Sequence, residues 1–166
     1  FQDGGGYTGE KGSFKVPIVF DNLIASGEMP VTIAVFINPG VVPATKPDAQ
    51  PRFNRSYEYD AFTADYSSFL IDEMLPVALK DLKVSTDPND RGICGSSSGA
   101  IAAFNVAWFR PDSFRRVYST IGTYVGLRGG DEIEDVLQRR FDEIELRLLV
   151  ENRLNRRRRR AAHGHG

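Results

Sequence analysis

Ser97 is the residue best placed for chemistry. In residues 90–104, a short apolar run, Ile93-Cys94, leads into Gly95-Ser96-Ser97-Ser98-Gly99, and small residues follow. A Gly-x-Ser-x-Gly sequence between a buried strand and a helix is typical of a nucleophile elbow, a strained turn that exposes a serine hydroxyl past the end of a sheet. We therefore expect Ser97 to be a nucleophile. The alternative is a turn rich in serine and glycine that has no chemistry or that binds an anion.

The residues around Ser97 suit acyl transfer. Gly95 and Gly99 carry no Cβ, so the strand and the helix can approach closely around the bend. The backbone N–H of Ser98 lies at the start of the expected helix, where it would point at a developing oxyanion.

A serine nucleophile needs a neighbour that accepts its proton, and histidine is the usual one. The chain has two histidines, His163 and His165. Either one preserves the order serine, acid, histidine if the acid is Asp131, or alternatively Glu132 or Asp135. The competing interpretation is that both histidines are solvent-exposed in a flexible tail and have no role.

Composition sets limits on the class of protein. The 166 residues, with a net charge of −1, suggest one globular domain and no general attraction to nucleic acid. Residues 156–160 are consecutive arginines, which we expect to form a solvated terminus. The single cysteine, Cys94, excludes an internal disulfide and is expected in the core. No membrane span or secretory leader is recognisable in the sequence as given, which leaves the localisation open between the cytoplasm and the periplasm.

The pattern of apolar residues predicts helices alternating with strands, and therefore a parallel α/β sheet. Residues 31–37 predict a strand buried on both faces, and residues 41–55 a long loop on the ligand side of the sheet. Residues 59–82 predict one helix, and residues 116–121 another strand.

The C-terminal part has a different character. From Asp131 onward, apolar residues at helical spacing and acid-before-base pairs four residues apart predict an amphipathic helix. We therefore expect a core over residues 1–130, an arginine-rich helical extension over residues 131–160 and a flexible tail over residues 161–166.

Several short motifs follow one another in a specific order. They are Phe1-Gln2-Asp3-Gly4-Gly5, Val19-Phe20-Asp21-Asn22-Leu23-Ile24, Phe36-Ile37-Asn38-Pro39-Gly40, Phe53-Asn54-Arg55-Ser56-x-Glu58-Tyr59-Asp60, Asp87-Pro88-Asn89-Asp90-Arg91, Gly95-x-Ser97-x-Gly99-Ala100 and Thr120-Ile121-Gly122. As a set they resemble the putative-esterase family of α/β-hydrolases, which includes enterochelin-esterase-like, esterase D-like and feruloyl-esterase-like enzymes. The likeness ends at about residue 132.

The resemblance implies a parallel sheet of α/β-hydrolase type, here shortened at both ends and followed by the C-terminal amphipathic helix. It implies Ser97 as the nucleophile, the Ser98 N–H as one oxyanion donor, and a second donor from the loop around Asp3 and Gly4. The implied reaction is hydrolysis of a small-molecule carboxylic ester through an acyl-enzyme, without cofactor or metal.

Two other classes of function compete with the esterase. The chain could be a catalytically incomplete α/β-hydrolase fragment that acts as an oligomerising or binding module, because an apolar helical stripe and open sheet edges need a partner surface. Binding of an anion or a nucleic acid through residues 156–160 is disfavoured, because the rest of the chain shows no basic surface. A homo-oligomer is expected, and no nucleic-acid or membrane partner is.

Overall fold

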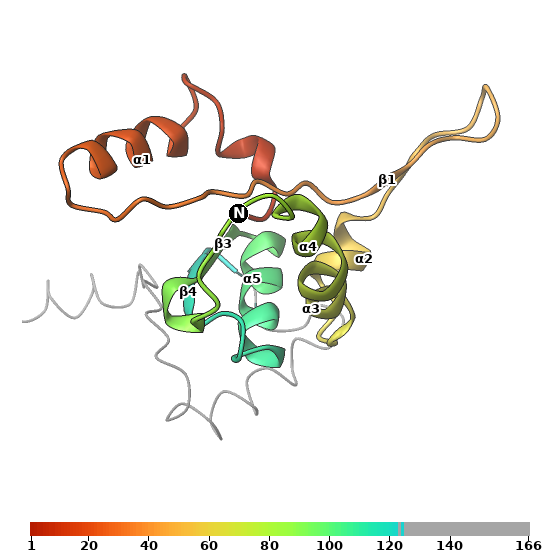
Figure 1. Ribbon diagram of the computed structural model, residues 1–166. Helices are drawn as coiled ribbons and strands as arrows, with labels where there is room; N and C mark the ends of the chain where they lie inside the picture. Colours follow the sequence, from red (N-terminus) through yellow and green to blue (C-terminus); the bar gives the residue numbers. More distant parts are fainter. Residues whose placement is uncertain (123, 125–166) are drawn as a thin grey trace, which may run out of the picture.

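The computed structural model describes residues 1–122 and Tyr124, in which helices alternate with extended segments (Figure 1). The helices are the short 3₁₀ turn η1 (Gly4–Gly6), α1 (Val16–Ala25), α2 (Arg55–Tyr59), α3 (Asp65–Ser68), the π-helix η2 (Phe69–Met74), α4 (Leu75–Ala78), the 3₁₀ turn η3 (Pro88–Asp90) and α5 (Ser98–Phe109). The strands are β1 (Val41–Val42), β2 (Arg52–Phe53), β3 (Gly92–Ser96) and β4 (Arg116–Thr120). The predicted C-terminal helix and tail lie outside the described residues.

The centre of the molecule is a parallel sheet. Strand β3 pairs with β4 in parallel, in a register that places Gly92 opposite Arg116. On the other side of β3, the Gln2 N–H donates to the Cys94 carbonyl at 2.8 Å, and Gln2 forms a parallel bridge with Ile37. The extended segments therefore lie in the order 31–37, 1–2, β3, β4. The strand predicted over residues 116–121 is confirmed as β4.

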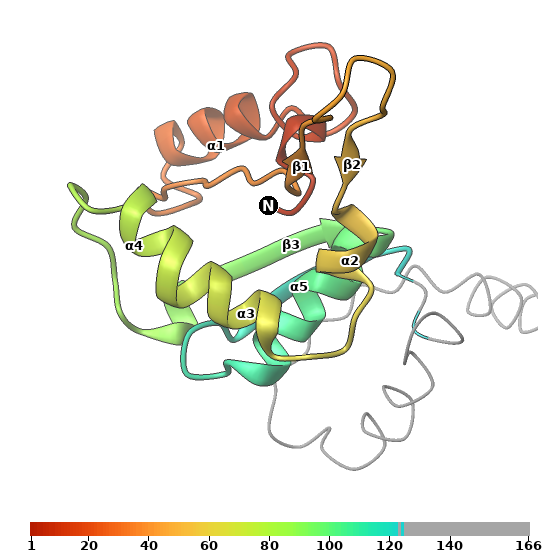
Figure 2. The ribbon, with the colours of Figure 1, turned by 90° about the vertical axis from the view of Figure 1, so that its right-hand side faces the viewer.

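Helices cover both faces of this sheet. Successive side chains of a strand point to opposite faces, so the apolar side chains of β3 are buried on both sides. Ile93 packs in the core shared with α3 and α5, whereas Cys94 packs with Val16 of α1 and with Tyr7. Figure 2 shows the two layers, with α1 on one side of β3 and with α3, α4 and α5 on the other.

Helix α5 is the central helix of the molecule. Its residues from Gly99 to Ala107 are all buried, and it packs against both β3 and β4. This burial follows from the sequence, since a helix that is apolar or small on all sides is stable only when it is enclosed.

The expectation that residues 31–37 form a strand buried on both faces is wrong. This segment is extended, and among the described residues its pairing consists of hydrogen bonds to residues 1–4, among them Phe1 N–H to the Val35 carbonyl at 2.8 Å. Val31 is 89% exposed and Ile33 47%. The segment lies at the edge of the described sheet, and apolar content alone does not distinguish an edge strand from a central one.

The single helix predicted over residues 59–82 is divided. Helix α2 ends at Tyr59, and a second helix runs over residues 65–78 as α3, η2 and α4. Within it the Leu75 N–H bonds to the Leu70 carbonyl, five residues back, which is the π-helical pattern. Pro76 follows directly and has no N–H to donate, so the wider turn sits where the regular ladder is already broken.

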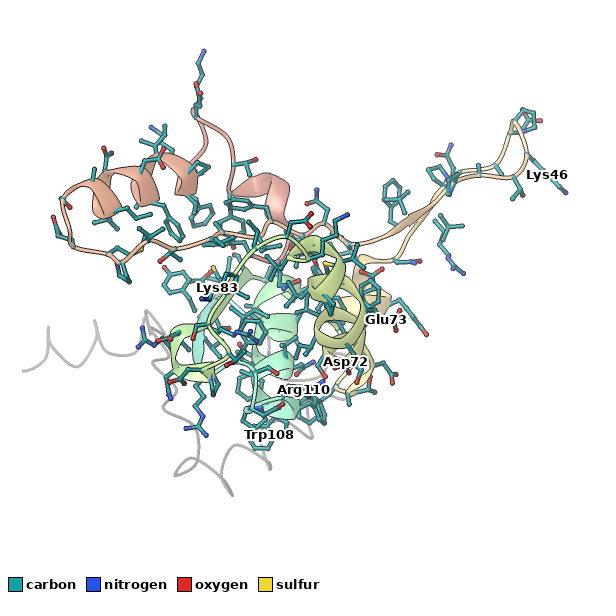
Figure 3. The ribbon with its side chains drawn as sticks, viewed as in Figure 1. Lys46, Asp72, Glu73, Lys83, Trp108 and Arg110 are labelled. Atoms are coloured by element: carbon teal, nitrogen blue, oxygen red, sulfur yellow. The ribbon has the colours of Figure 1, made fainter. Side chains whose placement is uncertain are left out.

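The predicted long loop over residues 41–55 is a projecting arm (Figure 1). Strands β1 and β2 pair antiparallel, with Val41 opposite Phe53, and both strands are exposed. Figure 3 shows Lys46 near the tip of this arm. Within the described part of the chain, no helix combines the length and the apolarity needed to cross a membrane.

Candidate active site

Ser97 occupies the turn between β3 and α5, as predicted. Its backbone angles are φ 57° and ψ −126°, a conformation that residues with a Cβ rarely adopt. The Ser97 N–H donates to the Thr120 carbonyl of β4 at 3.0 Å, and the Ser97 carbonyl accepts from the Ala100 N–H at 2.9 Å. The backbone is therefore fixed on both sides of the bend while Ser97 itself is exposed.

The two glycines of the motif are needed for close approach. A Cβ on Gly95 would lie 1.9 Å from the carbonyl oxygen of Gly99, so only a hydrogen fits there. A Cβ on Gly99 would lie 2.9 Å from the Asp3 Oδ2 atom and 3.3 Å from the Gln2 Cβ. The first pair closes the elbow, and the second shows that residues 2–3 lie directly against the first turn of α5.

The Ser98 N–H lies in the first turn of the twelve-residue helix α5. The first N–H groups of a helix have no acceptor within the helix and carry its positive dipole end. Among the described residues, no carbonyl or side chain accepts from the Ser98 N–H. It is therefore available to an oxygen bound beside Ser97.

The loop predicted to supply the second oxyanion donor lies beside α5, but its amides differ. The Gly4 N–H donates to the Ile37 backbone carbonyl at 2.8 Å and is therefore engaged, contrary to the expectation for Gly4. The Asp3 N–H makes a long hydrogen bond of 3.3 Å to the Tyr59 hydroxyl, and the Gly5 N–H donates to the Asn38 side chain at 2.9 Å. The Asn38 side chain is exposed and can move away from Gly5, whereas Tyr59 is fully buried, so the Gly5 N–H is the more accessible of these two amides.

Arg55 and Tyr59 hold this loop, and sequence reasoning assigned neither of them a role. The Arg55 guanidinium binds both carboxylate oxygens of Asp3, with Nε to Oδ1 at 2.8 Å and Nη2 to Oδ2 at 2.7 Å. It also lies over the Tyr59 ring, 5.7 Å from the centroid. The hydrogen bonds to Asp3 hold the pKa of Arg55 above its usual value. The available signal was the motif around Arg55, which pointed to a family without indicating a contact.

A buried polar pair extends the support beneath the loop. The Tyr66 hydroxyl donates to the Oε1 atom of Gln2, and both side chains are buried. Burial raises the pKa of Tyr66 above its ordinary value of 10.0, so the phenol stays protonated and remains a donor even in alkaline solution near pH 10. Gln2, which joins two segments of the sheet, is therefore fixed through its side chain as well.

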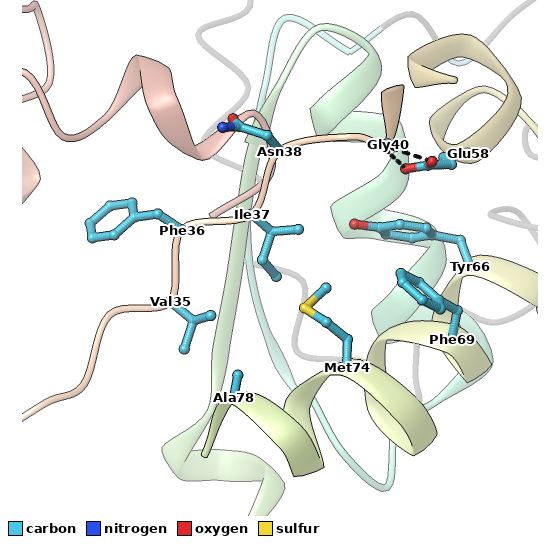
Figure 4. Close-up of a pocket in the computed structure, with 10 residues that line it drawn as sticks. All are labelled: Val35, Phe36, Ile37, Asn38, Gly40, Glu58, Tyr66, Phe69, Met74 and Ala78. Atoms are coloured by element: carbon cyan, nitrogen blue, oxygen red, sulfur yellow. Dashed lines mark hydrogen bonds between the residues drawn. The ribbon is translucent and has the colours of Figure 1, made fainter. Parts of the chain in front are cut away.

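A pocket of about 400 Å³ opens beside this support (Figure 4). It lies between residues 35–40 and the helix over residues 65–78, and Ile37, Phe69 and Met74 give it an apolar lining. The Gly40 N–H donates to the Glu58 carboxylate at its rim, at 3.0 Å. Ser97 does not line this pocket.

The remaining predicted site residues, His163, His165 and Asp131, lie outside the described residues. Within residues 1–122 and Tyr124, no group of three or more histidine, cysteine or acidic side chains could hold a metal ion. Burial raises the pKa of the Cys94 thiol, which packs against Tyr7 and Val16.

Comparison with known proteins identifies the family. The family model described as Putative esterase matches residues 1–125. The chain belongs to this family. The matched region contains the whole of the elbow and the loop around Asp3, and it ends near the point at which the likeness was expected to stop. No curated protein matches the chain significantly.

Two solved structures share the fold of this member of the Putative esterase family. The enterobactin esterase of Shigella flexneri, crystallised in the presence of 2,3-dihydroxy-N-benzoyl-glycine, is 21% identical, with a TM-score of 0.62. The enterochelin esterase of Shigella flexneri is 22% identical, with a TM-score of 0.59. Each match covers 82% of this chain but only 34% and 32% of the respective relative, so the chain spans about a third of their length. The described fold is thus of α/β-hydrolase type.

Proposed function

We propose that this protein hydrolyses carboxylic esters of small molecules through an acyl-enzyme on Ser97. The observation that carries the proposal is the Ser97 conformation, with φ 57°, at the tip of a strand–turn–helix unit. Strain of this kind costs about 1–3 kcal/mol and persists where the surroundings hold it, most often at functional sites. Membership of the Putative esterase family supports the same conclusion.

In the proposed reaction, the Ser97 hydroxyl oxygen attacks the ester carbonyl carbon and its proton passes to a general base. The carbonyl oxygen becomes an oxyanion, which accepts hydrogen bonds from the Ser98 N–H and from an amide of the loop at Asp3 or Gly5. The C–O bond then breaks, and the base returns the proton to the departing alcohol. Water attacks the acyl-enzyme in the same way and releases the carboxylic acid and Ser97.

The base and the acid of this mechanism are proposed from the sequence. His163 or His165 would accept the proton and Asp131 would orient the imidazole, since these are the histidines of the chain and an acid that precedes them. Deletion of residues 161–166 should then abolish ester turnover without unfolding the protein. Full activity in the deleted protein would refute a histidine base.

Hydrolysis of p-nitrophenyl acetate tests the nucleophile. Ser97→Ala should remove the activity while circular dichroism remains unchanged, because the covalent route is lost. Ser96→Ala is the matched control, since it removes a neighbouring hydroxyl from the same turn and should change the rate little. Equal activity in wild type and Ser97→Ala would refute the proposal.

One observation favours the second candidate, an oligomerising or binding module. Residues 31–37 leave one side without a paired strand among the described residues, and Val31 (89%) and Phe53 (71%) are largely exposed apolar side chains. Unpaired strand edges favour association with another chain. A homo-oligomer is compatible with either function. Light scattering at micromolar concentration tests whether the chain associates, and a monomeric mass would refute association.

A further inference from the structure

We propose that Arg55 is a positioning residue for catalysis, which holds residues 2–6 against the start of α5 and neutralises the Asp3 carboxylate beside the oxyanion site. This inference rests on the proposed function. Arg55 would touch neither the substrate nor Ser97, and it would act through Asp3.

The loop needs such a restraint because Asp3 is in a left-handed conformation, with φ 58° and ψ 44°. This conformation costs a residue with a Cβ roughly 1 kcal/mol, although aspartate tolerates it better than most. In addition, the 3₁₀ turn η1 that follows has only three residues and no side-chain cap. Local structure alone would therefore leave the Asp3 and Gly5 amides poorly fixed.

Arg55 supplies the restraint from a distant part of the chain. Its two parallel hydrogen bonds to Asp3 fix both the position and the plane of the carboxylate, which a single contact would not do. The side chains of Arg55 and Asp3 are only 38% and 30% exposed, and the stacking on Tyr59 limits the guanidinium further. Because Tyr59 also accepts from the Asp3 N–H, the side chain and the backbone of Asp3 are held together.

Arg55 also neutralises the charge of Asp3. The Asp3 Oδ2 atom lies so close to Gly99 that a Cβ there would come within 2.9 Å, and Gly99 is the second residue of α5. A bare carboxylate at this position would repel the negative charge that develops beside Ser97 and Ser98. The guanidinium of Arg55 cancels that charge, which leaves the helix N-terminus and the loop amides to stabilise the oxyanion.

A second arginine provides a matched control. Arg110 also makes hydrogen bonds to carboxylates, with Nη1 at 3.0 Å from Asp72 and Nε at 3.2 Å from Asp112. It follows the last residue of α5, at the opposite end of the helix from Ser97, and Figure 3 shows it beside Asp72. Arg110→Met therefore removes a comparable ion pair without touching the loop over residues 2–6.

The test compares Arg55→Met, Arg55→Lys and Arg110→Met in the full chain with two measurements. The first is hydrogen exchange of the backbone amides over residues 2–6, which reports the order of the loop directly. The second is the rate of Ser97 labelling by a fluorophosphonate, which builds negative charge on an oxygen as the ester does.

For Arg55→Met we expect hydrogen exchange over residues 2–6 to be roughly tenfold faster and Ser97 labelling to be roughly tenfold to a hundredfold slower. Arg55→Lys should change both less, because lysine keeps the positive charge but cannot form the two parallel hydrogen bonds to Asp3. Arg110→Met should match wild type in both. Unchanged exchange in Arg55→Met overturns the positional role, and unchanged labelling overturns the catalytic one. Should Arg55→Met fail to fold, Arg55→Lys decides by the same two criteria. If wild type is not labelled at all, the proposed function fails and the catalytic role with it, whereas exchange still judges the positional role.

Discussion

The elbow makes a strong prediction about Gly95. A Cβ at this position would lie 1.9 Å from the Gly99 carbonyl oxygen, 2.2 Å from the Gly99 carbonyl carbon and 2.8 Å from the Ala100 nitrogen. All three atoms belong to the backbone of α5, so no side chain can rotate out of the way. Ordinary contact begins near 3.4 Å, which means that Gly95→Ala must separate β3 from α5 by more than an ångström.

The expected cost is large because α5 is the central helix of the molecule. Overpacking of a core costs about 1–3 kcal/mol when side chains can adjust, and a backbone clash belongs at or above the upper end of that range. We therefore expect Gly95→Ala to lower the free energy of unfolding by about 3 kcal/mol or more. For a domain of this size, such a loss lowers Tm by roughly 10 °C.

Gly92→Ala is the matched control, since Gly92 lies in the same strand and its Cβ would make ordinary contacts of 3.7 and 3.8 Å with Arg116. Urea denaturation followed by circular dichroism measures both variants. Gly92→Ala should equal or slightly exceed wild type, because alanine restricts the unfolded chain. Equal stability of the two variants would refute the close approach of strand and helix at the elbow.

Two further predictions follow from Ser97 and Tyr66. Ser97→Gly and Ser97→Ala both remove the hydroxyl, but only glycine relieves the strain of the positive φ. Ser97→Gly should therefore be more stable than Ser97→Ala by about 1 kcal/mol in thermal unfolding, and an equal Tm for the two variants would contradict backbone strain. Burial raises the pKa of Tyr66 in the folded state above its unfolded value near 10, so its contribution to stability is complete below pH 10 and is lost as pH rises further. Tyr66→Phe should therefore lose stability less steeply above pH 10, and a slope identical to that of wild type in urea titrations at successive pH values would contradict this.

The sequence predicted the centre of the fold well. Strand β3, the turn at Ser97, helix α5 and strand β4 all lie where the pattern placed them, because their signals are local. Small residues must follow the elbow if the helix is to approach the sheet, and an apolar helix must be enclosed. These requirements can be recognised within about twenty residues of sequence.

The parts that the sequence did not predict depend on distant contacts. The exposure of Val31 depends on which segments lie next to it, and the helix predicted over residues 59–82 is divided between Tyr59 and Asp65, where the local pattern gives no stop. The pairing of Asp3 with Arg55 joins residues 52 positions apart, so no spacing rule indicates it. For the same reason, the engagement of the Gly4 amide by Ile37 could not be foreseen.

The central claim is that Ser97 is an activated nucleophile, and covalent labelling tests it most directly. The intact protein is incubated with a fluorophosphonate, digested, and analysed by mass spectrometry for the modified residue. The account predicts one label per chain, on Ser97, and none in Ser97→Ala, while Ser98→Ala is labelled because only its backbone N–H takes part. Folded protein that takes up no label, or that is labelled at another serine, would contradict the claim.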